Sequence, residues 1–319
     1  MPISRRSVFS YSAGLLLVFF CALAPATSET TASLQRYSVT VHKHTFALWA
    51  RIPPEPRGAV LLLHGRTWSS LPDFDLQVPG LHRSVLASLA ARGFAAYALD
   101  QRGYGETPRD ATGWITPRQA TKDAAATLAW IAARHPLLPR PALLGWSLGA
   151  ATAHLVAASS PANLSAVILY GYAPEPDASI MAVAEPSRPP AYKNTPEAAA
   201  GDFISPQVTE NEVVQAFVKT ALRTDPVHVD WKDEEQFLCD SSRIKLPALV
   251  LFGERDPNVE ERGAQRFFSH LAAKEKQMVI IPGADHCAHL ETTHNAWVNA
   301  VTDFLVRPGV LTPADGRRK

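Results

Sequence analysis

The sequence predicts an α/β protein with a mostly parallel central sheet, helices on both faces of that sheet and one helical insertion. The first observation is a set of short, wholly apolar runs, which are typical of strands buried on both faces of a parallel sheet. These runs occupy residues 59–63, 95–99, 142–144, 166–169, 248–252 and 278–281. The second observation is that amphipathic stretches alternate with the runs, and the third is that this alternation breaks over residues 173–240.

The strands and helices can be placed in chain order. Residues 37–41 and 45–50 are expected to form an antiparallel hairpin that turns near Lys43, ahead of the first buried run. Apolar residues at three- and four-residue spacing predict the helices that cover the sheet. These helices are expected over residues 83–92, 118–134, 148–159, 263–273 and 293–304. The alternation of strand and helix implies a parallel sheet that is covered by helices.

Residues 173–240 interrupt the alternation with a cluster of prolines and only short helices, such as residues 212–222. The apolar side chains of Phe203, Phe217 and Trp231 argue against a disordered loop, because such residues usually have something to pack on. We therefore expect an insertion that covers the carboxyl edge of the sheet as a lid. The remaining parts would be a core at residues 27–172 and 241–308, and a flexible tail at residues 309–319.

Residues 1–26 have the three-part layout of a secretory signal. Arg5 and Arg6 precede an apolar run at residues 13–24, and small residues lead up to Ala26. We expect cleavage after Ala26 and a periplasmic or secreted mature chain. The paired arginines also suit a twin-arginine signal, and this alternative stays open. No stable membrane span is expected after cleavage, and an uncleaved anchor is disfavoured because the run is shorter than the ~20 apolar residues that a spanning helix needs.

Charge and cysteine content narrow the class of protein further. Lys and Arg number 31 against 30 for Asp and Glu, so the chain has no excess positive charge to attract nucleic acid, and no nucleic-acid partner is expected. Export would place Cys239 and Cys287 in an oxidising compartment, where a disulfide can form between them. The sequence leaves open whether they bond or stay two buried thiols, because a disulfide needs Cα atoms within roughly 7 Å of each other.

The pentapeptide GWSLG at residues 145–149 supplies a candidate nucleophile, Ser147. It follows the apolar run at residues 142–144 and precedes an alanine-rich helical stretch. Glycines on either side of a serine in this strand-turn-helix setting permit a tight turn that presents the hydroxyl above the sheet. The competing interpretation is that Ser147 only caps the helix that follows. We favour the nucleophile, because the sequence also offers the other groups that an activated serine requires.

A base and an acid follow in the chain order expected for such a serine. His286 comes just after the last buried run, so it should lie at the same sheet edge as the serine. His289 is the alternative base, and the histidine that is not the base would be a packed or helix-capping residue. Asp256 follows the preceding run and would orient the His286 ring through a hydrogen bond. The rival acids are Glu254, which we expect to point elsewhere, and Asp177, which lies in proline-rich chain.

Two backbone N–H groups are candidates for binding an oxyanion. One belongs to Leu148, directly after the nucleophile, and the other to Arg66, in the loop that follows the first buried run. His64 begins that loop and invites a catalytic interpretation. We expect it instead to brace the loop by hydrogen bonding.

Taken in this order, the motifs resemble the α/β-hydrolase fold family, in its lidded branch, over about residues 37–306. The motifs that carry the resemblance are HG at residues 64–65, DQRGYG at residues 100–105, the serine turn, GERD at residues 253–256 and GADH at residues 283–286. The resemblance implies a triad of Ser147, Asp256 and His286 and a lid between residues 173 and 240. One subgroup of the family attacks alkyl halides or epoxides with an aspartate at the nucleophile position, and Ser147 argues against that chemistry.

The expected function is hydrolysis of a carboxylic ester through an acyl-enzyme, with a small acyl compound as substrate. No cofactor and no metal are expected, because the cysteines and histidines lack ligand spacings such as C-x-x-C or H-E-x-x-H. The alternatives keep the same triad on an amide, a lactone, a carbon–carbon bond or a peracid. A ligand-binding protein that hydrolyses little is a further alternative, because fold alone does not fix function.

Overall fold

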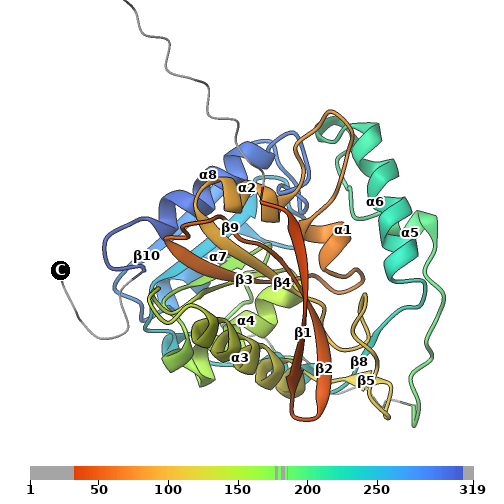
Figure 1. Cartoon of the computed structure of the whole chain (residues 1–319), viewed down its shortest axis with the longest axis horizontal. Coiled ribbons are helices and arrows are strands. Elements are labelled where there is room, and N and C mark those ends of the chain that lie inside the picture. The colour runs from red at the N-terminus through yellow and green to blue at the C-terminus, as the bar shows by residue number, and fades with distance from the viewer. Residues whose placement is uncertain (1–31, 177–178, 181–183, 185, 312–319) are drawn as a thin grey trace, which may run out of the picture. The chain divides into compact units, whose positions relative to one another are not determined.

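The computed structural model describes residues 32–176, 179–180, 184 and 186–311, and in these residues eight strands form one sheet (Figure 1). The order across the sheet is β1-β2-β4-β3-β6-β7-β9-β10. The strands are β1 (Leu34–Val41), β2 (His44–Arg51), β3 (Gly58–Leu63), β4 (Phe94–Leu99), β6 (Ala142–Trp146), β7 (Val167–Tyr170), β9 (Ala248–Gly253) and β10 (Lys276–Ile281). The pairs β1–β2 and β2–β4 are antiparallel and the other neighbours are parallel, which confirms the predicted sheet and its hairpin.

Helices cover both faces of the sheet. They are α1 (Ser70–Phe74), α2 (Val85–Ala91), α3 (Pro117–Arg134), α4 (Leu148–Ser159), α5 (Pro196–Ala200), α6 (Asn211–Thr224), α7 (Glu261–His270) and α8 (His294–Leu305). Val60 and Leu62 of β3 belong to the core that α2 and α8 close, whereas Leu61 and Leu63 belong to the core that α3, α4 and α7 close. This alternation follows from the two-residue period of a strand. Each such side chain is fully buried, which stabilises the fold by roughly 1.5–3 kcal/mol.

The predicted helices begin and end within a few residues of their expected bounds, and the caps explain where. The helix expected from residue 118 starts at Pro117, because Thr116 accepts the N–H of Gln119 and proline suits the first turn. The elements that the sequence did not predict are short: α1, α5 and a two-stranded sheet of β5 (Trp114–Ile115) and β8 (Asp230–Trp231). Their lengths are too small for a hydrophobic period to show.

The segment 173–240 is inserted between two strands that pair directly, β7 and β9. Its helices α5 and α6 pack side by side (Figure 1). Phe217 of α6 lies with its ring centroid 6.2 Å from that of Trp68 in the core and 5.1 Å from that of Phe203. The apolar side chains of the segment are therefore packed, as expected, while its role as a lid stays a prediction.

The two cysteines are not bonded to each other, so the structure decides the question that the sequence left open. Cys287 is fully buried, and its thiol donates to the carbonyl oxygen of Asp202 at 3.1 Å. Cys239 is half-buried and borders a cavity that Cys287 does not line. The disulfide was not excluded by sequence, because only the fold determines which cysteines approach each other.

Two sequence predictions concern residues that the structure does not describe, in whole or in large part. The signal at residues 1–26 lies outside the described residues, as does most of the predicted tail, and both stay predictions. Among the described helices, none has the length and apolar character needed to cross a membrane.

Candidate active site

Ser147 occupies the turn between β6 and α4 in a strained conformation. Its φ of 54° and ψ of −119° lie outside the regions that L-residues favour, at a cost of order 1–3 kcal/mol. The flanking glycines permit the turn, because a Cβ on Gly145 would collide with the Gly149 carbonyl and a Cβ on Gly149 would collide with the Leu63 carbonyl. Within the described residues the Ser147 side chain makes no capping hydrogen bond to α4, so the helix-cap interpretation is not supported. The side chain instead lines a pocket.

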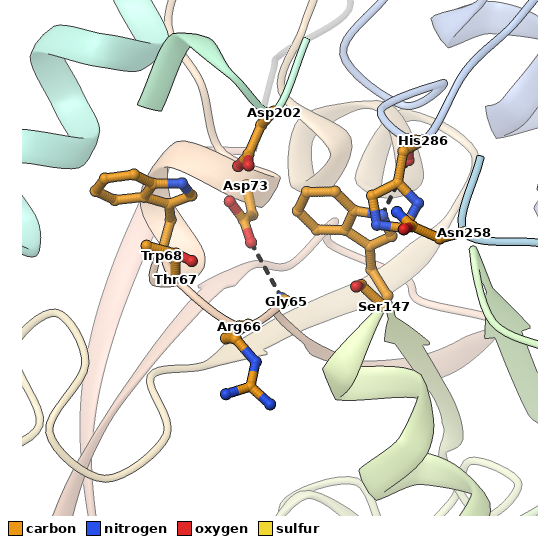
Figure 2. Close-up of a pocket in the computed structure, with 10 residues that line it drawn as sticks. Gly65, Arg66, Thr67, Trp68, Asp73, Ser147, Asp202, Asn258 and His286 are labelled. Atoms are coloured by element: carbon orange, nitrogen blue, oxygen red, sulfur yellow. Dashed lines mark hydrogen bonds between the residues drawn. The ribbon is translucent and has the colours of Figure 1, made fainter. Parts of the chain in front are cut away.

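His286 and Asp256 meet at the carboxyl edge of the sheet. His286 Nδ1 lies 2.8 Å from Asp256 Oδ2, and the Asp256 side chain is fully buried. Asp256 Oδ1 accepts the N–H of Asn258 at 2.9 Å, which fixes the carboxylate. The His286 ring borders the same pocket as Ser147 (Figure 2). With Nδ1 held by the carboxylate, Nε2 is the ring nitrogen that remains for proton exchange.

The rival residues occupy other positions. His289 is fully buried with Nδ1 3.0 Å from the Tyr170 hydroxyl, and burial holds its pKa well below the usual value, so it is a packed neutral residue. The Glu254 carboxylate accepts the N–H of Gly283 at 2.7 Å. Asp177 lies outside the described residues. The structure therefore brings together His286 and Asp256, as the sequence predicts.

The loop at residues 64–69, which we call the oxyanion loop, is braced by His64. The Gln101 N–H donates to His64 Nε2 at 3.1 Å, so the proton is on Nδ1, which donates to the Gly65 carbonyl at 2.9 Å. Burial lowers the pKa of His64 to about 4, and the ring is neutral near pH 7. The expected bracing role is confirmed.

Arg66 and Leu148 lie near Ser147. Both residues border a pocket that Ser147 also lines, and the Leu148 amide is the first of α4, outside the hydrogen-bond ladder of that helix. The Arg66 carbonyl accepts the Tyr104 hydroxyl, and its guanidinium bonds Glu234 at 2.6 Å. Figure 2 shows this guanidinium directed away from His286. The Arg66 carbonyl and guanidinium thus have partners of their own, and the role of the Arg66 N–H as an oxyanion donor stays a prediction.

Two pockets meet at Ser147. The smaller has a volume of about 180 Å³, and its lining includes Gly65, Arg66, Thr67, Trp68, Asp73, Trp146, Asp202, Asn258 and His286. The larger has a volume of about 850 Å³ and is bordered by many apolar side chains, among them Leu148, Ala151, Tyr172, Pro174, Phe237 and Phe267. Within the part of the chain that the structure describes, no group of three or more His, Cys, Asp or Glu side chains is placed to hold a metal ion.

Comparison with known proteins identifies the family. Residues 54–293 match the sequence profile of the hydrolase family described as serine aminopeptidase, S33. The match includes the oxyanion loop, the Ser147 turn, Asp256 and His286. The chain belongs to this family. It is a serine hydrolase with the α/β-hydrolase fold.

Individual relatives of this serine hydrolase are distant. A monoacylglycerol lipase of Mycolicibacterium smegmatis is 23% identical in an alignment 269 positions long, which covers 79% of this chain and 89% of the lipase. The human serine hydrolase BPHL is 27% identical, with 84% of each chain covered. The carboxylesterase CesB of Bacillus subtilis superposes with a TM-score of 0.58 at 17% identity, covering 88% of this chain and 94% of the esterase. At that identity the structural likeness shows the fold.

The smaller pocket of this serine hydrolase contains two carboxyl groups that the sequence did not reveal. Asp73 of α1 accepts the Gly65 N–H at 3.2 Å, and Asp202 follows α5. Figure 2 shows the two carboxyl groups close to each other above the oxyanion loop. Burial raises the pKa of Asp202 to about 6, and burial together with the Asp202 charge raises the pKa of Asp73 well above its usual range. Neither residue belongs to a recognisable motif, so no sequence signal could have identified them.

Other residues hold His286 in place. The Trp146 indole N–H and the Tyr170 hydroxyl both donate to the His286 carbonyl, at 3.0 and 2.8 Å. A Cβ on Gly171 would lie 2.9 Å from His286 Cε1, so a glycine here leaves room for the ring. Gly171 could have been identified from the sequence as a candidate site residue, because it directly follows a buried strand at the sheet edge where functional groups collect.

Proposed function

We propose that this serine hydrolase cleaves carboxylic esters through an acyl-enzyme. Ser147 is the nucleophile, His286 the general base and acid, and Asp256 the residue that orients the ring. The observation that carries the proposal is the shared pocket: Ser147, in its strained turn, and His286, bonded to Asp256 at 2.8 Å, line one cavity.

The mechanism follows from these positions. Ser147 Oγ attacks the ester carbonyl carbon while His286 Nε2 takes its proton, and the buried Asp256 stabilises the imidazolium that results. The N–H groups of Leu148 and Arg66 bind the oxyanion, and one such donor contributes about 10²–10³-fold in rate. His286 then returns the proton to the leaving alcohol. Water attacks the acyl-enzyme by the same steps and releases the acid and Ser147.

The two pockets suggest how an ester lies in the site. His286 borders the smaller pocket, so the leaving alcohol that receives its proton belongs there. The larger, more apolar pocket then takes the acyl chain. Its border includes Pro174 and Phe237 of the segment 173–240, which supports the role of that segment as a lid. The names of two relatives, monoacylglycerol lipase and carboxylesterase, also favour an ester.

Cleavage of an amide beside a free amine is the second candidate. The family profile is described by the name serine aminopeptidase. The carboxyl groups of Asp73 and Asp202 in the smaller pocket are acceptors that suit an ammonium group. Rates on alanine 4-nitroanilide and on 4-nitrophenyl butyrate, measured with one preparation, distinguish the two candidates. The ester proposal expects the faster turnover on the butyrate.

Replacement of the nucleophile tests the proposal. We expect Ser147→Ala to lower kcat/KM on 4-nitrophenyl butyrate by roughly 10³-fold or more. The matched control is Ser159→Ala, at the other end of α4, where the hydroxyl donates to the Leu155 carbonyl. An unchanged rate in purified Ser147→Ala protein would contradict the proposal, and a large loss in the control would show that the helix is at fault.

A further inference from the structure

The inserted segment reaches the oxyanion loop through the carboxylate of Asp225, the residue that ends α6. Asp225 is 3% exposed. Its Oδ2 accepts the Ser69 N–H at 2.9 Å and the hydroxyls of Ser69 and Thr224, both at 2.7 Å. Its Oδ1 accepts the Gly105 N–H at 2.8 Å. All of these donors are neutral, so one buried carboxylate joins three separate segments by hydrogen bonds alone.

Two further contacts run from the same segment to the same loop. Trp231 of β8 donates its indole N–H to the Tyr104 hydroxyl at 2.9 Å, and Tyr104 donates in turn to the Arg66 carbonyl. Glu234 bonds the Arg66 guanidinium at 2.6 Å. The peptide groups on both sides of Arg66 are therefore constrained: the Gly65 carbonyl accepts His64 Nδ1, and the Arg66 carbonyl accepts the Tyr104 hydroxyl, which Trp231 also bonds.

The position of this loop matters for the proposed chemistry. An oxyanion donor acts only when it lies 2.7–3.1 Å from the developing charge. A displacement of about 1 Å can cost on the order of 10²-fold in rate. Ser69 is three residues from Arg66, so a carboxylate that fixes the Ser69 backbone also limits where the Arg66 N–H can point.

We propose that Asp225 is a positioning residue for the oxyanion hole, so that the inserted segment completes the catalytic machinery in addition to bordering its pocket. The inference rests on the proposed function, because it assigns the Arg66 N–H to the oxyanion. A purely structural role would lower the stability of the fold and leave the chemistry of folded molecules unchanged. A positioning role weakens transition-state binding and leaves substrate binding unchanged.

The test compares Asp225→Asn with the wild type. Asparagine keeps the shape but has a single acceptor oxygen, and its NH₂ group would face the N–H of Ser69 or Gly105. We expect kcat on 4-nitrophenyl butyrate to fall about 10- to 100-fold with KM within about twofold. The Ki of a trifluoromethyl ketone, whose serine adduct carries an oxyanion, should rise by the same factor as kcat falls.

The matched control is Asp123→Asn, which removes another buried carboxylate, one that bonds Arg102 at 2.6 and 3.0 Å and does not line either pocket. Its thermal stability should fall while the Ki stays at the wild-type value. An unchanged kcat and Ki in folded Asp225→Asn would overturn the inference. If that variant does not fold, Ser69→Ala decides, because it removes the hydroxyl that donates to Asp225 from the oxyanion loop: parallel changes in kcat and Ki support the inference and unchanged values overturn it.

Failure of the proposed function gives a different result. If the wild-type protein neither hydrolyses the ester nor is labelled at Ser147 by a fluorophosphonate, the ester mechanism is wrong, whatever the variants do. If the wild type is active and labelled, the outcome for Asp225→Asn bears on the positioning role alone.

Discussion

The two pockets that meet at Ser147 differ in chemistry. The smaller, about 180 Å³, is bordered by ionisable groups: His286, Asp73 and Asp202. The larger, about 850 Å³, has many apolar side chains at its border, such as Leu148 and Phe237, and ionisable groups that include His154 and Glu234. In the proposed mechanism, proton transfer takes place beside His286 in the smaller pocket, which we call the polar side, whereas the larger pocket, the apolar side, offers contact area for a chain that does not react.

The pockets also differ in how the fold makes them. One wall of the larger pocket comes from a single helix, because Leu148, Ala151 and His154 recur at three-residue spacing along α4, and its other walls come from the inserted segment and α7. The smaller is assembled from the oxyanion loop, α1, the end of α5 and the histidine loop, which are far apart in the sequence. One helix can thus follow the proposed nucleophile and form a wall of one pocket, whereas the other walls of both pockets need segments that the fold brings together.

The largest expected effect is a loss of kcat when the acid that orients His286, on the polar side, is replaced. We expect Asp256→Asn to lower kcat by about 10³–10⁴-fold, because an amide no longer fixes the useful tautomer of His286. The comparison variant is Glu254→Gln, which alters the rival acid that bonds the Gly283 N–H. Steady-state kinetics on 4-nitrophenyl butyrate should place Glu254→Gln near the wild type. Equal losses in the two variants would show that Asp256 has no special role.

A smaller and selective effect is expected on the apolar side. Ala151 is one turn along α4 from Ser147 and borders the larger pocket. Ala151→Phe should fill part of this pocket and lower kcat/KM on 4-nitrophenyl decanoate at least about tenfold, relative to the acetate, since lost burial of several methylenes costs about 0.8 kcal/mol each. The acetate rate of the same variant is the internal control. An equal loss on both esters would place the acyl chain elsewhere.

The smallest expected effect is on the pH dependence of stability, to which a residue of each pocket contributes with opposite sign. Burial raises the pKa of Asp202 from 3.8 to about 6, so its contribution to the free energy of unfolding declines as pH rises through that window. Burial lowers the pKa of His154 from 6.5 to about 4, so its contribution declines as pH falls through that window.

Urea denaturation between pH 4 and 6.5 checks this contrast. Stability should rise more steeply with pH in Asp202→Asn than in the wild type, and less steeply in His154→Gln, by at most about 1.4 kcal/mol per pH unit for the histidine. Slopes that change in the same direction in both variants would contradict the contrast.

The sequence could predict features that depend on residues close together in the chain, and it could not predict those that depend on contacts between separate segments. Buried strands, long helices and the Ser147 turn have local patterns, and chain order then led to Asp256 and His286. Asp225 bonds Ser69, which is distant in the chain, and Asp73 and Asp202 meet only because the fold brings α1 and the end of α5 to one pocket, so no spacing reveals these three residues. The cysteines show the same limit, because Cys239 and Cys287 are separate thiols in the fold although the sequence allowed a bond.

The most direct test of the central claim is the detection of an acyl group on Ser147. Wild-type protein is mixed with 4-nitrophenyl acetate, quenched in acid within the first turnover, digested and examined by mass spectrometry. The account predicts one acetyl group on the peptide that contains Ser147, formed with a burst of 4-nitrophenol, and neither in Ser147→Ala. Hydrolysis without an acetylated Ser147 peptide, or a burst that persists in Ser147→Ala, would contradict it.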